Sequence, residues 1–292
     1  MSLRVLLTGI TGFLGSHLAT ELLNKGHEIV ALKRKLSPMT RVSSKFSNLS
    51  LQNLEETDLS ELFYGYKQFD AVIHTATCYG RNGEDSCQIL EANLLFPLKL
   101  MQASADANVG LFVNTDTALD EYLNPYSLSK VQFTDWGRYF ARKRKIQFVN
   151  LKLEHFYGTG DDNSKFTAHV INSCLANVPE LDLTLGEQKR DFIHIDDIVS
   201  AYSLILEKRS ALEDWFLEFE VGSGTAVTIR QFVETVHNLT ASNTRLNFGA
   251  LPYRFGETMF SQANTEALRA LGWHCHYELL EGLQLIIQRS KQ

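Results

Sequence analysis

Tyr126 and Lys130 stand four residues apart in the segment NPYSLSK, so they share one face if this segment is helical. A tyrosine phenol normally titrates at about pH 10, and a lysine ammonium close to it favours the ionised phenolate. Such a phenol can donate or accept a proton at neutral pH. Thr117 closes the preceding segment NTDT, and its hydroxyl could hold a substrate oxygen. These residue types predict acid–base catalysis.

A second segment, RVLLTGITGFLGS, contains Gly9, Gly12 and Gly15 in a G-x-x-G-x-x-G pattern. The pattern lies where an expected strand over residues 4–8 turns into an expected helix over residues 12–25. At such a turn the tight bend, the close approach of backbone to a pyrophosphate and the packing of helix on strand each exclude a Cβ atom. The free amides of the first helical turn then face an anion. The glycines therefore predict a dinucleotide site.

These two segments need a scaffold that brings them together, and the hydrophobic pattern of the chain predicts one. Strands are expected over residues 4–8, 27–32, 70–74, 111–114 and 147–153, and helices over residues 12–25, 91–107 and 126–143. Strands that alternate with helices indicate an α/β fold with a doubly wound parallel sheet. Both segments then lie at the carboxyl edge of that sheet, where such folds bind ligands.

The composition limits the partners of the protein. The chain has 292 residues, of which 44% are hydrophobic and 21% are charged, so it can bury a large core. A net charge of −6 offers no general basic face for nucleic acid or an anionic membrane. No apolar run approaches the ~20 residues of a membrane helix, and the start of the chain lacks a small-residue cleavage site. We therefore expect a cytoplasmic protein that binds a small molecule.

The four cysteines do not predict a metal site or a disulfide framework. Cys78, Cys87, Cys174 and Cys275 have no CxxC spacing, and we expect all four to be small apolar fillers. The run His274-Cys275-His276 has metal-binding residue types, but adjacent residues of a strand point to opposite faces. No second ligand cluster accompanies the run, so no metal is expected.

The end of the second expected strand bears on the choice of dinucleotide. Folds selective for NAD place an Asp or Glu about 20 residues after the glycines, where it binds the ribose 2′-hydroxyl. This chain instead has Lys33, Arg34 and Lys35 there. Basic side chains suit a 2′-phosphate, so NADP(H) is favoured over NAD(H). A solvated basic loop is the alternative explanation.

Taken together, these motifs resemble those of the extended short-chain dehydrogenase/reductase family, which comprises nucleotide-sugar epimerases, dehydratases and ketoreductases. The resemblance runs over essentially the whole chain. Its further segments are FDAVIHTAT, EANLLFPLKL, FYGTGD, EQKRDFIHIDDIVSAY and YRFGE followed by LGW. The resemblance implies a Rossmann-like fold, a nicotinamide cofactor and a nucleotide-diphosphate sugar as the substrate.

The family pattern also implies the roles of individual residues. It assigns the catalytic triad to Tyr126, Lys130 and Thr117. The residues that it places at the cofactor are Gly9, Thr11, Gly12, Phe13, Leu14, Gly15, Lys33, Arg34, Asp58, Leu59, Thr75, Ala76, Thr77, Asn93, Tyr126, Lys130 and His155. The residues that it places at the substrate are Tyr79, Lys165, Arg190 and Arg254, with Glu154 near the nicotinamide and sugar. Two alternatives stay open: Arg190 in an ordinary ion pair with Asp191 or Asp196, and His155 as a structural histidine.

Departures from the family pattern bear on the reaction. Dehydratases of this family carry Thr-Asp-Glu after the fifth strand, whereas Thr117 is followed by Ala118 and Leu119. If Thr115 and Asp116 are the match instead, Thr117 stands where the glutamate would be. A sugar 4,6-dehydratase is therefore not expected. The segment between Thr117 and Tyr126 is also shorter than in typical epimerases.

Within the family, the segments NTDT, PYSLSK and GEQKRDFIHIDDIV resemble those of the CDP-abequose and CDP-paratose synthases. These enzymes reduce the 4-keto group of a CDP-3,6-dideoxy-4-ketohexose for O-antigen biosynthesis. The resemblance implies a nucleotide-sugar 4-ketoreductase. Two alternatives remain: a redox-neutral 4-epimerase that retains tightly bound NAD, and a nucleotide-sensing protein without catalysis. The sequence leaves the configuration at C4, the sugar and the nucleobase open.

The resemblance finally implies how the chain is divided. It gives a dinucleotide-binding domain of residues 1–155 plus about 188–212, and a smaller, interleaved nucleotide-sugar-binding domain of residues 156–187 and 213–292. Members of the family pair their fourth and fifth helices across a dimer axis. In this chain these are the helices that carry Asn93 and Tyr126, so a homodimer is implied. Apolar residues on the same helices are equally well explained as core.

Overall fold

The structure is a computed structural model that describes residues 2–43, 45–66, 68–254 and 256–290. The chain forms two compact units. The first unit contains Met1–Lys152 and Val199–Phe219, and the second contains Leu153–Ile198 and Glu220–Gln292. Each unit is therefore built from two separate stretches of the chain.

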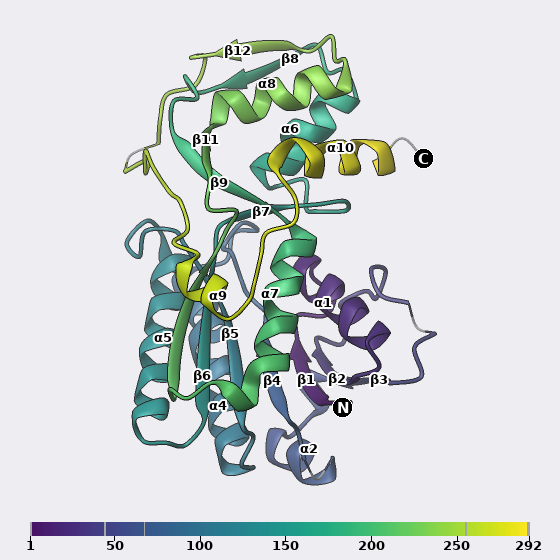
Figure 1. The fold of residues 1–292 in the computed structure, drawn as a ribbon, viewed down its shortest axis with the longest axis vertical. Coiled ribbons are helices and arrows are strands. Elements are labelled where there is room, and N and C mark those ends of the chain that lie inside the picture. The colour runs from purple at the N-terminus through teal and green to yellow at the C-terminus, as the bar shows by residue number, and fades with distance from the viewer. Residues whose placement is uncertain (1, 44, 67, 255, 291–292) are drawn as a thin grey trace. The chain divides into compact units, whose positions relative to one another are not determined.

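The first unit is built on a seven-stranded sheet with the strand order β10-β6-β5-β4-β1-β2-β3 (Figure 1). The strands are β1 (Arg4–Thr8), β2 (Glu28–Lys33), β3 (Leu49–Asn53), β4 (Ala71–His74), β5 (Leu111–Thr117), β6 (Gln147–Leu153) and β10 (Phe216–Val221). β1 pairs in parallel with β2 and β4, β2 with β3, and β4 with β5. This order confirms the expected Rossmann-like, doubly wound fold, with the reversal of strand order beside β1.

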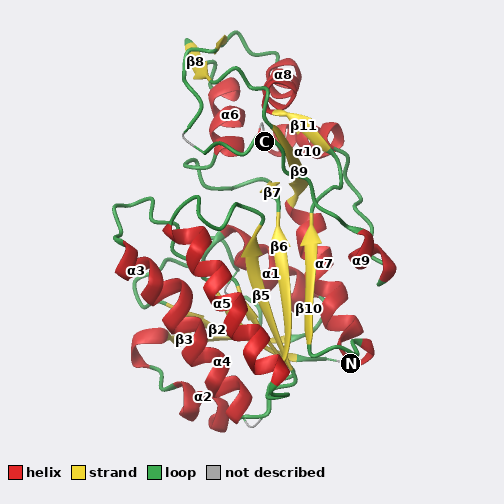
Figure 2. Cartoon of the chain, turned by 90° about the vertical axis from the view of Figure 1, so that its left-hand side faces the viewer, coloured by secondary structure: helices red, strands yellow, loops and turns green. Residues whose placement is uncertain are grey.

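Helices cover both faces of this sheet, with α2, α4 and α5 on one face and α1 and α7 on the other (Figure 2). The helices are α1 (Phe13–Asn24), α2 (Leu59–Gly65), α3 (Ser86–Leu90), α4 (Phe96–Asp106), α5 (Pro125–Arg142) and α7 (Ile195–Lys208). Short 3₁₀ turns span Leu54–Glu56 and Arg209–Ala211. The helix expected over residues 91–107 is not uniform, because Glu91–Leu95 is π-helical and only then does α4 begin.

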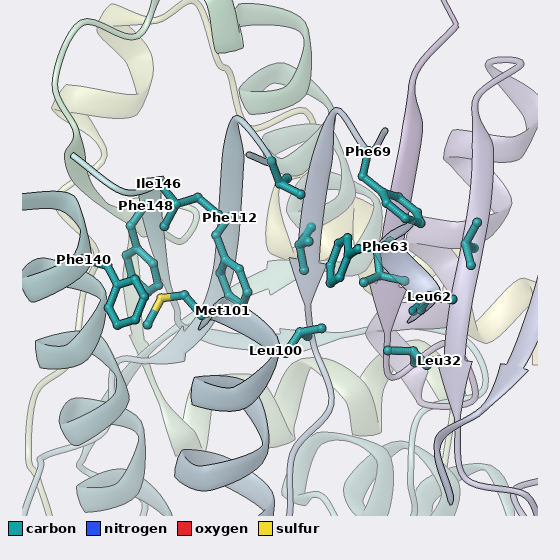
Figure 3. Packing of buried hydrophobic residues seen from close by; sticks show 14 of the residues in the cluster. Leu32, Leu62, Phe63, Phe69, Leu100, Met101, Phe112, Phe140, Ile146 and Phe148 are labelled. Carbon is teal, nitrogen blue, oxygen red and sulfur yellow. The ribbon is translucent and has the colours of Figure 1, made fainter. Parts of the chain in front are cut away.

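The core of the first unit fixes α5 against the sheet. Phe112 of β5 and Phe148 of β6 stack with ring centroids 5.7 Å apart, and Figure 3 shows them among the other buried side chains of this cluster. Gly137 of α5 packs directly on Phe148, because a Cβ at this glycine would lie 2.4 Å from the ring. Burial of each such phenylalanine contributes roughly 1.5–3 kcal/mol. The close packing of Gly137 on Phe148 therefore fixes the distance between α5 and the sheet.

The second unit contains a three-stranded sheet with the order β11-β9-β7 and a two-stranded sheet of β12 and β8. The strands are β7 (His155–Tyr157), β8 (Glu180–Leu183), β9 (Lys189–His194), β11 (Ala226–Thr228) and β12 (Arg245–Phe248), and the helices are α6 (Phe166–Leu175), α8 (Ile229–Thr240), α9 (Glu266–Ala270) and α10 (Leu279–Ser290). Its core includes Phe192 stacked on Phe232 with ring centroids 4.3 Å apart. β9 is the central strand, parallel to β7 and antiparallel to β11.

Two expectations from the sequence need correction. β5 extends to Thr117, three residues beyond the expected end at Asn114, because polar residues continue the strand where hydrophobic ones stop. The cysteines are not uniformly buried fillers: only Cys174 is buried, whereas Cys87 is exposed and the other two are half-buried. All four are free thiols.

Candidate functional site

The glycine turn between β1 and α1 has the geometry that its sequence pattern predicts. Gly9 has φ of +79°, in the left-handed region that favours glycine. A Cβ at Gly9 would lie 2.5 Å from Thr75 Oγ1, and a Cβ at Gly15 would lie 2.1 Å from the Gly9 carbonyl oxygen. Gly12 donates its amide to the same carbonyl at 2.9 Å. The turn therefore leaves no room for side chains at Gly9 and Gly15.

The start of α1 suits a phosphate. Gly12 is the N-cap residue, it makes no side-chain cap, and the first helical turn contains no acidic residue. The first turn of α1 includes Phe13, Leu14 and Gly15, and the helix dipole places partial positive charge at this end of the helix. Thr11 lies in the preceding turn. These features fit the pyrophosphate of a dinucleotide.

The ends of β1 and β4 are joined beside this turn. Thr75 Oγ1 donates to the Thr8 carbonyl oxygen at 2.8 Å. The amides of Thr75 and Ala76 both donate to Thr8 Oγ1, at 3.2 and 3.3 Å. The expected cofactor residues Thr75 and Ala76 therefore lie next to Gly9, as the resemblance implies.

Asn93 links the segment after β4 to the start of α5. It is fully buried, and its amide oxygen accepts from Thr77 Oγ1 at 3.1 Å and from the Cys78 amide at 2.7 Å. Its amide nitrogen donates to the Cys78 carbonyl oxygen at 2.8 Å and to Ser129 Oγ at 3.0 Å. Ser129 Oγ in turn donates to the carbonyl oxygen of Tyr126 at 2.7 Å. This placement favours a positioning role for Asn93 over direct contact with a cofactor.

The basic segment after β2 is partly engaged within the protein. Lys33 Nζ donates to the carbonyl oxygens of Arg34 and Lys35, at 2.9 and 3.1 Å. Lys35 Nζ lies 2.5 Å from a carboxylate oxygen of Glu56. Arg34 is exposed in the same loop. Of the two basic residues expected to face a 2′-phosphate, Arg34 is therefore the one whose charge is better presented to a ligand.

Asp58 and Leu59, which are also expected at the cofactor, lie at the start of α2. Asp58 is the N-cap residue of this helix, and its carboxylate accepts from the Glu61 amide at 2.9 Å. Leu59 is the first residue of the helix. The Asp58 side chain is exposed, so a ligand can reach it while it caps the helix.

The candidate catalytic residues lie together at the carboxyl edge of the first unit's sheet. The side chain of Asn124 accepts from the Ser127 amide at 2.9 Å and so begins α5 just before Tyr126. The Thr117 hydroxyl lies near enough to the Tyr126 phenol to lower its pKa. The Tyr79 ring packs on the Tyr126 ring with centroids 4.9 Å apart. Lys130 follows one helical turn later.

Burial shifts the pKa of both Tyr126 and Lys130. It raises the pKa of the Tyr126 phenol well above its ordinary value, and the nearby Thr117 hydroxyl opposes this only in part. Burial also lowers the pKa of Lys130 to about 8, against the opposing pull of Asp116. Desolvation of the phenolate is the largest cause of the rise at Tyr126. That Lys130 favours the ionised form of the phenol stays a prediction.

Asp116 points to the opposite side of β5 from Thr115 and Thr117, because side chains alternate along a strand. It is almost fully buried, and its carboxylate accepts from Thr134 Oγ1 at 3.1 Å and from Asn150 Nδ2 at 2.8 Å. Thr115 Oγ1 lies 2.6 Å from the Tyr202 hydroxyl. These contacts engage Asp116 and Thr115 within the protein. The sequence pattern did not single out Asp116, Asn150 or Tyr202.

The second unit contains three of the four residues expected to bind the nucleotide sugar, Arg190, Lys165 and Arg254, whereas Tyr79 lies in the first unit. Arg190 is buried on β9, and its guanidinium donates to Glu257 at 2.6 Å and to the Lys189 carbonyl oxygen at 2.9 Å. Burial lowers the pKa of Arg190, whereas the carboxylates of Glu257 and Glu154 oppose that shift. An ion pair of Arg190 with Asp191 or Asp196 was the alternative, and it is wrong because Glu257 is the partner.

Lys165 and Arg254 are the other residues of this unit expected at the substrate, and Glu154 and His155 are expected near the nicotinamide and sugar. Lys165 pairs with Asp161 at 2.9 Å and lies over the Phe156 ring at 4.2 Å from its centroid. His155 Nδ1 lies 3.4 Å from Glu154, which also accepts from Ser261 Oγ at 2.6 Å. Arg254 is exposed.

Two further expectations concern metals and membranes. Among the described residues, no group of three or more His, Cys, Asp or Glu side chains could hold a metal ion. His276 instead pairs with Asp197 at 3.1 Å. Within the same residues, none of the helices has the length and apolar character needed to cross a membrane.

Comparison with known proteins shows the family of the chain. Residues 5–217 match the NAD dependent epimerase/dehydratase family. The chain is 32% identical over 295 residues to the CDP-abequose synthase of Salmonella muenchen, covering 99% of this chain and 98% of that protein. It is 33% identical over 300 residues to the CDP-abequose synthase of Salmonella typhimurium, covering 98% and 97%.

Solved structures show the same fold. MoeE5 in complex with UDP-glucuronic acid and NAD superposes with a TM-score of 0.83 at 26% identity, covering 99% of both chains. The UDP-glucose 4-epimerase of Thermotoga maritima superposes with a TM-score of 0.84 at 21% identity, covering 99% of this chain and 98% of that one. The chain therefore belongs to the NAD dependent epimerase/dehydratase family, the extended short-chain dehydrogenases/reductases, and is an NAD(P)-dependent enzyme that acts on nucleotide sugars.

Proposed function

We propose that the protein reduces the 4-keto group of a nucleotide-diphosphate deoxyhexose with NADPH, as a step of deoxysugar biosynthesis. The substrate that we favour is a CDP-4-keto-3,6-dideoxyhexose, because the two Salmonella relatives are CDP-abequose synthases and match over nearly their full length. The observation that carries the proposal is the half-buried Tyr126 side chain, whose ring packs on Tyr79 and which lies one helical turn before the buried Lys130. Reduction of a carbonyl group needs a side chain that carries a proton before the reaction starts and donates it to the carbonyl oxygen.

The reaction follows from this arrangement. The glycine turn would hold the pyrophosphate of a nicotinamide cofactor, which would supply the hydride that reduces C4. The Thr117 hydroxyl and the Tyr126 phenol hydrogen-bond the carbonyl oxygen, which gains negative charge as C4 is reduced. Tyr126 Oη then donates its proton to that oxygen. Lys130 holds the nicotinamide ribose, and the Tyr79 ring shields one face of the phenol.

The preference for NADPH is supported by the charge at the end of β2. An acidic residue that would bind the 2′-hydroxyl of NAD is replaced by Lys33 and Arg34. Arg34 is exposed and suits a phosphate. Because Lys33 Nζ is bonded to two carbonyl oxygens of its own loop, its main role is to shape that loop.

We assign the two substrates of the reaction to the two units. The first unit binds the dinucleotide through the glycine turn, the start of α2 and the segment after β4. The second unit binds the diphosphate of the sugar nucleotide through Arg190 and Arg254, with Lys165 and His155 beside the sugar. Guanidinium groups suit diphosphate because they are always charged and donate in a fork.

We also propose a homodimer that pairs α4 and α5 with the same helices of a second copy. Trp136 and Tyr139 of α5 support it, because 42% and 51% of their surfaces are exposed. Large aromatic side chains exposed side by side are enriched at interfaces between proteins.

The second candidate is a redox-neutral 4-epimerase that retains NAD. It is supported by the UDP-glucose 4-epimerase of Pisum sativum, which is 25% identical over 331 residues, and by MoeE5, which is 26% identical and was solved with UDP-glucose and NAD. The same Tyr, Lys and Thr would serve such an enzyme. A tyrosine phenol is protonated at neutral pH in either kind of enzyme, so the protonation of Tyr126 does not choose between them. Reduction is supported by the two CDP-abequose synthases, which match this chain at 32% and 33% identity.

The test is NADPH oxidation, followed by absorbance, with a CDP-4-keto-3,6-dideoxyhexose made in situ. We expect turnover by the wild type, a loss of about 100-fold or more in Tyr126→Phe and a slower rate with NADH. Tyr122→Phe is the matched control, because this tyrosine is exposed in the same segment, and its rate should equal that of the wild type. A protein that purifies with bound NAD, oxidises neither cofactor and interconverts an intact nucleotide sugar would establish the epimerase instead.

A further inference from the structure

Lys165 is the N-cap residue of α6, where a positive charge is unfavourable by itself. The helix dipole already places partial positive charge at the N-terminus of a helix. The first turn of α6 contains no acidic residue that could balance the lysine. A group outside α6 must therefore stabilise the charge of Lys165.

Asp161, four residues before Lys165, provides this balance. Its Oδ1 accepts from Lys165 Nζ at 2.9 Å and from the Asp162 amide at 2.8 Å. The Asp161 side chain is 1% exposed, whereas that of Lys165 is 17% exposed. Asp161 Oδ2 is buried and has no hydrogen-bond partner among the residues that the structure describes. Burial raises the pKa of the Asp161 carboxyl, and Lys165 opposes that rise. Lys165 is therefore the main partner of a covered carboxylate.

The position of the ammonium is fixed by a second contact. Lys165 Nζ lies over the Phe156 ring of β7, 4.2 Å from its centroid. The loop of residues 158–165 joins β7 to α6 and turns at Gly160, which has φ of +81°. An ammonium group has three N–H donors, so it can bind Asp161 and donate to a ligand at the same time. Because the Asp161 carboxylate repels an anion beside it, a neutral hydroxyl group suits this ammonium better than a phosphate does.

We propose that Asp161 is a positioning residue for the substrate, which holds the Lys165 ammonium over Phe156 so that it donates to a hydroxyl group of the hexose. The proposal deepens the proposed function, which places Lys165 beside the sugar, and it rests on that placement. Arg190 and Arg254 are the residues assigned to the diphosphate. Without Asp161 the ammonium loses its fixed place, because the lysine stem is flexible.

Titration calorimetry with CDP-glucose and CDP tests this role without turnover. Asp161→Asn keeps the size of the side chain and can still accept from the Asp162 amide. We expect it to bind CDP-glucose about tenfold more weakly, because a hydrogen bond to a charged group is lost, and to bind CDP as the wild type does. Lys165→Met should show the same loss, and the double variant should show no further loss.

The matched control is Asp162→Asn. Asp162 is the exposed neighbour of Asp161, and its carboxylate accepts from the Ser164 amide at 2.8 Å. An asparagine can accept the same hydrogen bond, so both affinities should equal those of the wild type. If the wild type prefers uridine, the same variants are titrated with UDP-glucose and UDP.

A stability cycle tests the ion pair without any ligand. Urea unfolding at pH 7 compares the wild type, Asp161→Asn, Lys165→Met and the double variant. Lys165→Met should lower the urea midpoint clearly in the wild-type background and clearly less in the Asp161→Asn background. Only in the first case is a buried carboxylate left without its cation. If Lys165→Met alone does not fold, recovery of folded protein in the double variant supports the pairing.

The outcomes separate this proposal from the proposed function. Equal losses of CDP-glucose and CDP affinity in Asp161→Asn would show that Lys165 binds the diphosphate, and unchanged affinities would show a purely structural ion pair. Either result would overturn the proposal, as would an equal loss of the urea midpoint in both backgrounds. If no keto sugar is reduced but only CDP-glucose binding is weakened, the proposed reaction fails and the role of Asp161 stands.

Discussion

The guanidinium of Arg190 donates to the carboxylate of Glu257 at 2.6 Å, and the two side chains are 8% and 20% exposed. A buried guanidinium needs such a partner because an unpaired buried charge is strongly unfavourable. Glu154 adds a second carboxylate close to Arg190. If Arg190 binds the diphosphate of the sugar nucleotide, the ligand and Glu257 compete for the same donors.

This competition predicts that Glu257→Gln binds a nucleoside diphosphate more tightly than the wild type does. The variant removes the competing charge but keeps a side chain that can accept from Arg190. We expect a gain of about threefold to tenfold in CDP affinity, because hydrogen bonds to charged groups contribute about 1.5–3 kcal/mol and part is retained. Calorimetry measures the affinity. Glu234→Gln is the control: it removes the exposed partner of Arg230 in the same unit, and it should leave the CDP affinity unchanged. Equal or weaker binding in Glu257→Gln would exclude competition.

The part of the site that the sequence predicted best is the part fixed by local backbone geometry. Glycine spacing between a strand and a helix specifies a turn by itself, and Gly9 and Gly15 occupy positions where a Cβ would collide with backbone. The tyrosine and lysine spacing likewise placed both residues on one face of α5. Hydrophobic periodicity found most strands of the first sheet, but β5 was ended too early because its last residues are polar.

The same geometry predicts the effect of Gly15→Ala. A Cβ there would lie 2.1 Å from the Gly9 carbonyl oxygen, so α1 would have to move away from the turn. We expect a loss of ~1–3 kcal/mol in the free energy of unfolding and a large loss of NADPH affinity. Gly65→Ala in α2 is the control, since a Cβ there meets nothing within 4 Å, and it should be neutral or slightly stabilising. Urea unfolding and NADPH titration measure both quantities, and wild-type NADPH affinity in Gly15→Ala would contradict the assignment.

Arg34 should determine the choice between the two dinucleotides. Arg34→Ala removes a guanidinium that can pair with a 2′-phosphate, and we expect about tenfold weaker NADPH binding with little change for NADH. Arg41→Ala, in the same connection between β2 and β3, provides a comparison for loss of a nearby positive charge. Titration of both variants with NADPH and NADH distinguishes the loss of a contact with the 2′-phosphate from the loss of a nearby positive charge. An equal loss of NADPH and NADH affinity in Arg34→Ala would show that the residue only shapes the loop.

The sequence could not predict the features of the site that depend on burial and on contacts between distant segments. Tyr126 and Lys130 are correctly paired by spacing, but the protonation of each is set by desolvation, which the spacing does not reveal. Asn93 matched a family position, yet its bonds to Cys78 and Ser129 emerge only when β4, the π-helical turn and α5 come together. Glu257 lies 67 residues from Arg190 in the chain, so no local pattern joins them.

The lowered pKa of Lys130 makes a prediction about stability and pH. An unfolded lysine titrates at 10.5, whereas Lys130 titrates at about 8 in the folded protein. The unfolded state therefore binds the proton more tightly, and the buried charge is unfavourable at every pH below 8. This penalty is relieved as the pH rises from about 8 towards 10.5, and its full size is roughly 3 kcal/mol.

Lys130→Met has a similar shape without the charge, so it should be more stable than the wild type at pH 7, by up to roughly 3 kcal/mol. Above pH 8 the difference between the two proteins should narrow, because the wild-type lysine becomes neutral. Urea unfolding at pH 6 to 9.5 measures the difference, with exposed Lys99→Met as a control that should show no such trend. A variant less stable than the wild type, or a difference that does not change with pH, would refute the assignment. An inactive but more stable variant would show that this lysine is retained for function at the expense of stability.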